Sequence, residues 1–349
     1  MNILVWISGW VDSAVTAYLL QQQGHRVVWG FMLNYLEEGN PECTTKQDLE
    51  SFYQVCSFLN IPYEVLDFRK EYEEKVLNYI YEGYLKGITP NPDVLCNSEV
   101  KFKLFLDEAL LMGYDMIATG HYAQIENMDG EYELHRGLDP AKDQSYFLAW
   151  LNQFQLSKAL FPIGGMEKTQ VRELAKKIGL PNAERKDSQW LCFVGNVSMS
   201  DFLQDKIGQK PWNILLEDGS IVGHHTGAYQ FTIGQRRGIG LNFQAYVIDV
   251  NVADNTVVVS KDPADEKLHR STFPLKAVSR IHEEPRFPMN AWCKVRYRQD
   301  LQECTIEKKD NQIVVQTKTP QKGVPNWQIC VMYAWEKGDT VMGCGEITQ

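Results

Sequence analysis

Apolar residues in the first half of the chain alternate between strand-like runs and helix-like spacing. The run Ile3–Ile7 predicts a buried strand, and the loop after it leads into a helix that Gly24 is placed to end. The pattern then repeats, with predicted strands at Arg26–Leu33, Tyr63–Phe68 and Asp115–Ala118 and predicted helices at Ser13–Gln23, Lys46–Leu59, Glu71–Lys86 and Ser98–Met112. Strands that alternate with helices indicate an α/β fold with a doubly wound parallel sheet. Ligands of such sheets bind beyond the carboxyl ends of the strands, so we expect the loops after Ile7, after Met32 and at Gly120 to converge.

The pattern becomes β-like toward the C-terminus. A hairpin is expected at residues 122–136, turning at Met128-Asp129-Gly130, and a helix at Lys168–Gly179. After Gly195 the predicted strands are short and glycines are frequent, and the last part of the chain alternates polar and apolar residues. We therefore expect an ATP-binding catalytic domain at residues 1–195, a small central linking domain at 196–265 and a C-terminal, closed or nearly closed β-barrel at 266–349.

Composition limits the kind of protein. Of the 349 residues, 44% are hydrophobic and 23% charged, which is ordinary for a soluble globular protein. No apolar run approaches the roughly 20 residues that span a bilayer, and a strand-like run begins at Ile3 where a signal peptide would lie. We expect a cytoplasmic protein without a membrane partner. The net charge of -10 argues mildly against a nucleic-acid partner, although a local basic surface can still bind a structured RNA.

The eight cysteines are scattered, and none of them forms a CxxC pair. A disulfide framework or a structural zinc site is therefore not expected, and no metal-ligand set is predicted. Most of these thiols should be reduced, buried and inert, which leaves one or two as candidates for reactive groups.

The loop Ser8-Gly9-Trp10-Val11-Asp12-Ser13 lies between the first predicted strand and the first predicted helix. Free backbone N–H groups and the positive end of a helix make such a loop a site for phosphate. Ser8 and Ser13 add hydroxyl donors, and Asp12 can hold Mg²⁺ against the phosphates. On spacing alone, an ordinary strand-to-helix turn capped by Asp12 or Ser13 fits equally well.

Sequence resemblance favours the ATP site. The pattern Ser-Gly-x-Val-Asp-Ser resembles the pyrophosphatase-type loop (PP-loop) of ATP-dependent adenylating enzymes. Further blocks resemble the tRNA-specific 2-thiouridylases, in that family's order and over essentially the whole chain. They are Thr89–Asn97, Thr119–Tyr122, Lys142–Phe147, Asp187–Phe193, Thr232–Arg236 and Arg296–Arg298.

The resemblance implies a mechanism. ATP adenylates the C2 oxygen of the wobble uridine of tRNA, and a cysteine persulfide then delivers sulfur while AMP departs. Cys192 matches the cysteine that carries the persulfide, and Cys96 matches the nucleophile that releases the sulfur by forming a disulfide with Cys192. Asp93 serves as acid/base or orients the uridine. A cysteine desulfurase or a relay protein supplies the persulfide. The same three groups also suit ligation of an iron–sulfur cluster, and that alternative stays open.

The resemblance also assigns binding residues position by position. Those that match the nucleotide site are Trp6, Ile7, Ser8, Gly9, Trp10, Val11, Asp12, Ser13, Met32 and Gly120. Those that match tRNA contacts are Asn91, Pro92, Asp93, His121, Lys142, Asp143, Gln144, Arg296, Tyr297 and Gln328.

The chain departs from the family pattern at tryptophans. Trp10 stands where the second glycine of the ATP loop is expected, and a ring at that point conflicts with close approach of phosphate. Glycine is expected in the same way at Trp6, Trp29, Trp150, Trp190, Trp212 and Trp327. Because independent mutations would not cluster on one severe exchange, we hypothesise that the gene uses UGA for glycine and that the codon is translated here as tryptophan.

Two rival functions remain at this stage. If the tryptophans are genuine, the chain is expected to bind ATP poorly and to act as a tRNA-binding protein with a disabled ATP loop. Another adenylating enzyme with the same loop, such as an amidating synthetase, is the second rival. The Cys96 and Cys192 pair and the β-rich C-terminal half argue against it.

Overall fold

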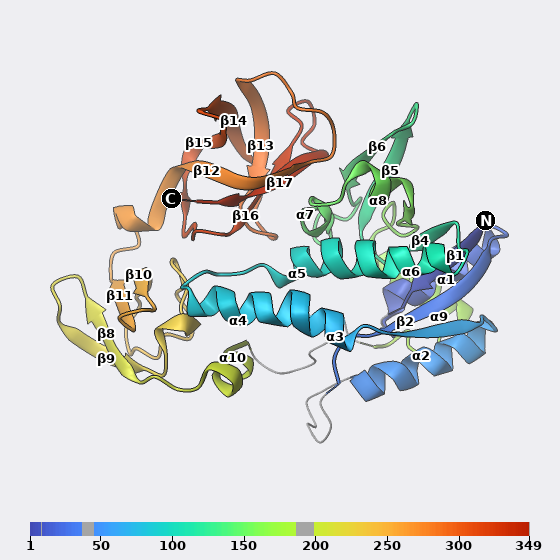
Figure 1. Cartoon of the computed structure of the whole chain (residues 1–349), viewed down its shortest axis with the longest axis horizontal. Coiled ribbons are helices and arrows are strands. Elements are labelled where there is room, and N and C mark those ends of the chain that lie inside the picture. Colours follow the sequence, from blue (N-terminus) through green and yellow to red (C-terminus); the bar gives the residue numbers. More distant parts are fainter. Residues whose placement is uncertain (8, 37–44, 186–198, 349) are drawn as a thin grey trace.

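The computed structural model describes residues 1–7, 9–36, 45–185 and 199–348. An α/β part carries the N-terminus, a small β-sheet follows at one end of the molecule, and a β-barrel forms the C-terminal part (Figure 1). The chain therefore has the α/β fold with a central small domain and a C-terminal barrel that the pattern predicts.

The N-terminal sheet is parallel, with strand order β3-β2-β1-β4-β7. Strands β2 and β3 lie on one side of β1, and β4 and β7 on the other. This reversal of strand order at β1 is typical of a doubly wound sheet and creates a crevice at the carboxyl ends of the strands. The strand bounds are β1 Asn2–Trp6, β2 Arg26–Leu33, β3 Tyr63–Asp67, β4 Met116–Ala118 and β7 Ala159–Leu160.

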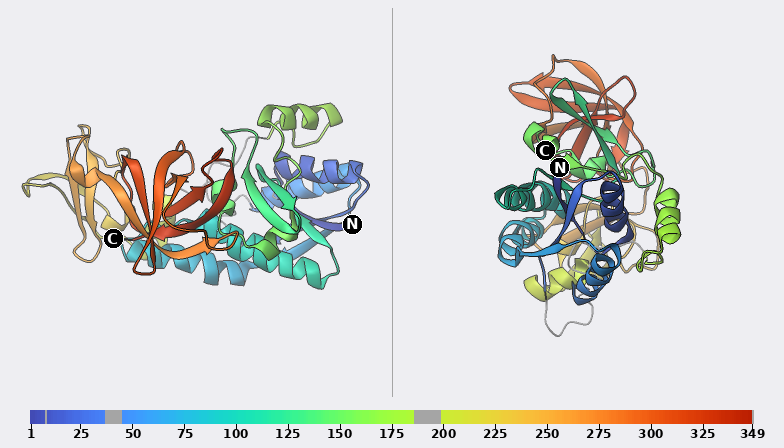
Figure 2. Two further views of the ribbon diagram at one scale, coloured as in Figure 1. Left: turned by 90° about the horizontal axis from the view of Figure 1, so that it is seen from above. Right: turned by 90° about the vertical axis from the view of Figure 1, so that its right-hand side faces the viewer.

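Helices cover both faces of this sheet (Figure 2, right). Ile3, Val5 and Ile7 pack in one core with the helices α1 (Val11–Gln22), α2 (Thr45–Leu59) and α9 (Lys168–Ile178). Leu4 and Trp6 point the other way, because side chains alternate along a strand. They pack with α4 (Asn78–Leu85) and α6 (Phe105–Leu111). The near-continuous apolar run of β1 is thus explained by burial on both faces.

Two long helices each contain a π-helical segment. The first runs through α3 (Arg69–Tyr72), the π-helical residues 73–77 and α4. The second runs through α5 (Pro92–Leu95), the π-helical residues 96–104 and α6, and lies beside the first in Figure 1. The expected start at Ser98, with Cys96 ahead of the helix, is wrong. Asn91 caps α5 by accepting a bond from the Val94 N–H at 3.3 Å, and proline occupies the first turn, so Cys96 lies inside the helix.

The predicted hairpin is present as β5 (Ala123–Met128) and β6 (Glu131–Arg136). Short helices α7 (Ser145–Leu148) and α8 (Gln153–Ser157) follow it. Strand β6 pairs with the last strand of the barrel through Thr340↔His135 and Val341↔Leu134. The hairpin therefore joins the N-terminal part of the chain to the C-terminal barrel by backbone hydrogen bonds.

The central part holds helix α10 (Met199–Ile207) and a four-stranded sheet with order β10-β11-β8-β9. Its core includes the buried residues Ile214, Val247 and Val257. The strand bounds are β8 Trp212–Leu216, β9 Ile221–His225, β10 Tyr246–Asn251 and β11 Thr256–Ser260.

The C-terminal strands follow the order β12-β15-β14-β13-β16-β17, and an additional pairing of β12 with β17 closes them into a barrel. This confirms the expected barrel. Cys293, Cys304, Cys330 and Cys344 are buried free thiols in its strands, as predicted for most of the cysteines. The strand bounds are β12 His269–Arg280, β13 Met289–Lys294, β14 Gln302–Lys309, β15 Gln312–Lys322, β16 Ile329–Tyr333 and β17 Thr340–Ile347. Among the described residues, no helix is long and apolar enough to cross a membrane.

Candidate active site

The loop after β1 is held by its backbone at Gly9. The Gly9 carbonyl accepts hydrogen bonds from Ser51 Oγ at 3.0 Å, Asn182 Nδ2 at 3.0 Å and Arg185 Nη1 at 3.2 Å. Gly9 has φ of +76°, and a Cβ there would lie 2.8 Å from the Asp48 carbonyl oxygen, so glycine is required on both counts. Ser8 lies outside the described residues.

Helix α1 begins directly after this loop. Trp10 is its N-cap residue and offers no side-chain hydrogen bond to the first turn. Asp12 and Ser13 lie within that first turn, so the alternative in which either of them caps the helix is wrong. Ser13 Oγ instead donates to the Trp10 carbonyl at 3.0 Å. A helix start without a side-chain cap is the arrangement that a phosphate can complete.

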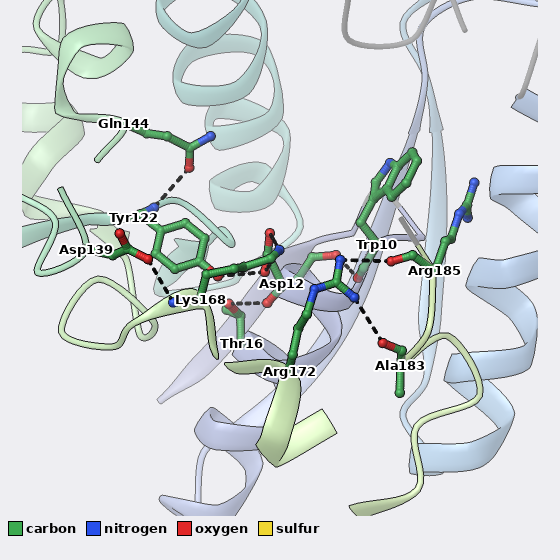
Figure 3. A network of polar contacts seen from close by, with 11 residues as sticks. Trp10, Asp12, Thr16, Tyr122, Asp139, Gln144, Lys168, Arg172, Ala183 and Arg185 are labelled. Carbon is green, nitrogen blue, oxygen red and sulfur yellow. Dashed lines mark hydrogen bonds and ion pairs between the residues drawn. The ribbon is translucent and has the colours of Figure 1, made fainter. Parts of the chain in front are cut away.

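The Asp12 carboxylate is the centre of a polar network (Figure 3). Lys168 Nζ contacts its two oxygens at 2.7 and 2.8 Å, and the Tyr122 hydroxyl donates to Oδ1 at 2.8 Å. Lys168 begins helix α9, and Tyr122 follows β4, so three loops of the sheet converge on one carboxylate. The binding of Mg²⁺ by Asp12 stays a prediction, and it would require Lys168 to give up its contact with this carboxylate.

Gly120 packs directly on the ATP loop. A Cβ at this position would lie 2.8 Å from the Ser13 amide nitrogen and 2.9 Å from the Asp12 carbonyl carbon. The loop after β4 therefore reaches the loop after β1 only because residue 120 has no side chain.

Replacing Gly120 by alanine is expected to push the first turn of α1 away from β4. We expect ATP affinity to fall by about 10-fold, since a displacement of that size loses about one hydrogen bond to the nucleotide. Isothermal titration with ATP measures the effect. Gly165→Ala is the matched control, because a Cβ there would meet its nearest atom at an ordinary 3.7 Å; an unchanged affinity in Gly120→Ala would contradict the prediction.

Asp93 and Cys96 lie in successive turns of the helix that starts at Pro92. Burial raises the pKa of Asp93 above its usual range, and Lys101 opposes this shift. Cys96 is buried, with 3% of its surface exposed. Cys192 lies outside the described residues, so the approach of the two thiols and the possible iron–sulfur ligand set stay predictions. No group of three or more metal-binding side chains occurs among the residues that the structure describes.

The raised pKa of Asp93 predicts a stability effect that depends on pH. The folded state binds the proton more tightly than the unfolded state, so the ionised carboxylate costs stability above its folded pKa, and this cost disappears at acidic pH. Asp93→Asn should therefore increase the free energy of unfolding at pH 7 and have little effect on it near pH 3. Urea unfolding at the two pH values measures this, and a variant that is equally destabilised at both would refute it.

His121 is buried beneath the end of β1. Its Nδ1 lies 2.6 Å from Thr119 Oγ1, and its ring is stacked on Trp6 with centroids 6.2 Å apart. Burial, aided by Lys101, holds the pKa of His121 well below its usual range, so the ring is neutral at physiological pH. A direct tRNA contact of His121 would require the substrate to enter this buried position.

The remaining predicted tRNA contacts lie around the junction of the catalytic part and the barrel. The Tyr297 ring lies 4.3 Å from that of Phe147, and its hydroxyl donates to the Lys142 carbonyl at 3.4 Å. Arg296 is exposed beside Tyr297, and Gln328 is partly buried directly before β16. Asn91 and Pro92 begin the helix of Cys96. The structure thus brings residues from three distant segments to one region.

Asp143 and Gln144, two of the predicted tRNA contacts, are held by hydrogen bonds within the catalytic part. The buried Asp143 carboxylate accepts bonds from Arg136 Nε at 2.9 Å and from the N–H groups of Gly137 and Ser145 at 3.0 and 3.1 Å. Gln144 Oε1 accepts from the Tyr122 N–H at 3.0 Å. These bonds fix the segment that leads from the hairpin to α7, and a role in tRNA binding stays a prediction.

Sequence reasoning missed three cations of this site. Lys168 binds Asp12, Arg185 binds Gly9 and Asp48, and Lys101 lies beside Trp6. The position of Lys168 at the start of a predicted helix was the available signal, since a lysine there is disfavoured by the helix dipole unless an anion is nearby.

Comparison with known proteins identifies the family. Three family models match in order: tRNA methyl transferase HUP domain at residues 1–196, tRNA methyl transferase PRC-barrel domain at 200–261 and aminomethyltransferase beta-barrel domain at 270–347. A tRNA-specific 2-thiouridylase of Halalkalibacterium halodurans is 40% identical over 352 residues, which cover 99% of this chain and 94% of that protein. The chain belongs to the tRNA-specific 2-thiouridylase family.

Other members of the tRNA-specific 2-thiouridylase family match similarly. The protein of Geobacillus thermodenitrificans is 39% identical over 354 residues, which cover 100% of this chain and 95% of that protein. The protein of Cupriavidus taiwanensis is 41% identical over 357 residues, which cover 99% and 98%. The family is one of tRNA sulfurtransferases, so the comparisons confirm the expected enzyme class.

The tryptophans at expected glycine positions differ in their surroundings. Trp327 has φ of +70°, a backbone conformation that is unusual for a bulky residue and ordinary for glycine. Trp29 is fully buried, and its Nε1 has no hydrogen-bond partner among the described residues. Trp212 is 53% exposed, and Trp190 lies outside the described residues. The conformation of Trp327 and the unpaired Nε1 of buried Trp29 favour the hypothesis that glycine is the natural residue at these two positions.

Proposed function

We propose that this chain catalyses the ATP-dependent 2-thiolation of the wobble uridine of tRNA in the cytoplasm. The observation that carries the proposal is the contact of Gly120 with the backbone of Asp12 and Ser13, which brings the loops after β1 and β4 together at a helix start suited to phosphate. The helix of Asp93 and Cys96 covers the same face of the sheet as Trp6 and Met32. The residue before the ATP loop and the buried Cys96 thiol therefore belong to one core on this face of the sheet, which supports the proposal.

The proposed reaction has two stages. The C2 oxygen of uridine attacks the α-phosphorus of ATP, and pyrophosphate leaves. The terminal sulfur of the Cys192 persulfide then attacks C2, and AMP leaves with the electron pair of the C2–O bond. The Cys96 thiolate attacks the Cys192 sulfur of the resulting C2–S–S linkage, which forms a Cys96–Cys192 disulfide and leaves the sulfur on uridine. An external thiol reduces that disulfide, and a persulfide donor protein recharges Cys192.

Protein groups near the crevice have distinct proposed tasks. Mg²⁺, held by Asp12, would neutralise charge on the phosphates of ATP. Asp93, with its raised pKa, is suited to carry or accept a proton at the uridine. The tRNA is proposed to bind around the junction with the barrel, through Lys142, Gln144, Arg296, Tyr297 and Gln328.

The test is an in vitro thiolation assay with ATP, a persulfide donor and unmodified tRNA, read by mass spectrometry of the wobble nucleoside. It should be run on the chain as written and on Trp10→Gly. Cys96→Ser should abolish product, whereas Cys330→Ser should not, because Cys330 is a buried thiol of the barrel. Thiolation that survives in Cys96→Ser would contradict the proposed mechanism.

A tRNA-binding protein with a disabled ATP loop is the second candidate. The observation that favours it is the Trp10 ring, which lies 4.1 Å from the Arg185 guanidinium beside the ATP loop. This candidate would be supported if the natural protein contains tryptophan at position 10 and binds tRNA without binding ATP or catalysing thiolation. Mass spectrometry of the natural protein distinguishes glycine from tryptophan at that position.

A further inference from the structure

Lys101 is a buried cation with no role in the proposed reaction. It lies in the π-helical segment that begins at Cys96, and only 4% of its surface is exposed. Buried lysines are normally paired with a carboxylate. Within the described residues, no hydrogen bond or ion pair to a protein group involves Lys101. Its ammonium instead lies 4.2 Å from the centre of the Trp6 ring.

The Trp6 indole lies between a cation and an aromatic ring. Trp6 is 7% exposed and ends strand β1, directly before the ATP loop. It contacts the Lys101 ammonium and is stacked on the His121 imidazole at an interplanar angle of 28°. His121 is in turn backed by the rings of Phe102 and Phe161, each with a centroid distance of 5.8 Å. A cation and an aromatic ring on a flat group are the features with which proteins bind a splayed-out base.

The position of this ring fits one base of the tRNA. Lys101 lies near enough to Asp93 and His121 to influence the pKa of each. The ring thus lies between the ATP loop that follows Trp6 and the helix that carries Asp93 and Cys96. A uracil whose C2 must meet both the α-phosphate of ATP and a cysteine sulfur has to enter this space.

We propose that the Trp6 indole fills the binding slot of the wobble uracil and that Lys101 is a substrate-binding residue whose ammonium faces the C2 oxygen and the adenylate formed on it. This inference rests on the proposed function. The ammonium donates to the C2 oxygen in the bound base and neutralises the phosphate oxygens after adenylation. When sulfur adds to C2 and the C2–O bond breaks, the same charge stabilises AMP as it leaves with the electron pair.

The chain offers a matched control for Lys101. Lys103 lies two residues further in the same π-helical segment, is exposed, and pairs with Glu99 at 2.8 Å. Both lysines carry the same charge on the same element, and only Lys101 contacts the Trp6 ring. A general electrostatic effect of the segment would lower RNA affinity in both Lys101→Met and Lys103→Met. An effect of the slot would lower it only in Lys101→Met.

The experiment compares full-length variants for binding of an anticodon stem-loop with uridine or cytidine at the wobble position. Trp6→Gly should bind the uridine stem-loop at least ~10-fold more tightly than the chain as written, and discriminate against cytidine, because the slot is opened. In the Trp6→Gly background, Lys101→Met should remove this gain and Lys103→Met should keep it. Thermal unfolding of each variant verifies that it is folded, and Lys101→Arg should retain part of the gain.

Two outcomes would overturn the inference. One is equal affinity of Trp6→Gly and the chain as written for the uridine stem-loop, and the other is a gain that persists in folded Lys101→Met. The thiolation assay separates this from the proposed function. In the Trp6→Gly background, thiolation that is unaffected by Lys101→Met would support the function and refute the slot. Uridine-specific binding that depends on Lys101, without any thiolation, would support the slot and refute the function.

Discussion

Replacing Trp10 by glycine is expected to increase ATP affinity by at least ~10-fold. The Trp10 ring lies 4.1 Å from the Arg185 guanidinium, and the same guanidinium donates to the Gly9 carbonyl and pairs with Asp48. The indole ring and the guanidinium therefore contact one another at the loop where phosphate is expected. Removing the indole frees the space beside the loop for a nucleotide.

Isothermal titration with ATP measures the effect of Trp10→Gly. Trp212→Gly is the matched control, because it makes the same exchange at an exposed position of the central sheet, and it should leave ATP affinity unchanged. Equal affinity of Trp10→Gly and the chain as written would show that the indole does not obstruct the nucleotide. The hypothesis of natural glycine at position 10 would then lose its functional support.

Removing the Asp12 carboxylate is expected to lower the free energy of unfolding by about 3 kcal/mol. Asp12 neutralises Lys168, whose side chain is 10% exposed, and accepts a bond from the Tyr122 hydroxyl. Asp12→Ala would leave the buried ammonium without this carboxylate. Asp12→Ala combined with Lys168→Met should regain at least half of the loss, since the buried charge is then gone as well.

Urea unfolding of the two single variants and the double variant measures this coupling. Glu303→Ala is a control, because its pair with Lys318 is exposed and should contribute less than ~1 kcal/mol. A double variant that is as unstable as the sum of the single variants would show that the pair is not coupled. Both Asp12 variants should also lose ATP binding if Asp12 holds the metal ion.

The sequence predicts most of the catalytic domain because its strands are short, apolar and separated by clear helices. The start of the helix around Cys96 is missed although Asn91-Pro92 is a typical helix start. The π-helical turn shifts the register of the residues after Cys96, so an α-helical period assigns Lys101 to no definite face.

The site is less predictable than the fold because its contacts cross long distances in the chain. Lys168 is 156 residues from Asp12, and Arg185 is 176 residues from Gly9. No local pattern links such pairs. Resemblance names the residues of the loop and the cysteines, but it does not show that Asp143 is bound within the protein or that the Trp6 ring lies against Lys101.

Strand β6 of the catalytic part pairs with β17 of the barrel. A tRNA held between the two parts would therefore meet two parts that are joined by a continuous sheet rather than by a flexible hinge. Any movement that admits an anticodon must arise elsewhere, at the central sheet or in the helices, because swinging the barrel away would break backbone hydrogen bonds. The barrel then keeps a fixed position relative to the catalytic part, and this position limits how far an anticodon arm can enter.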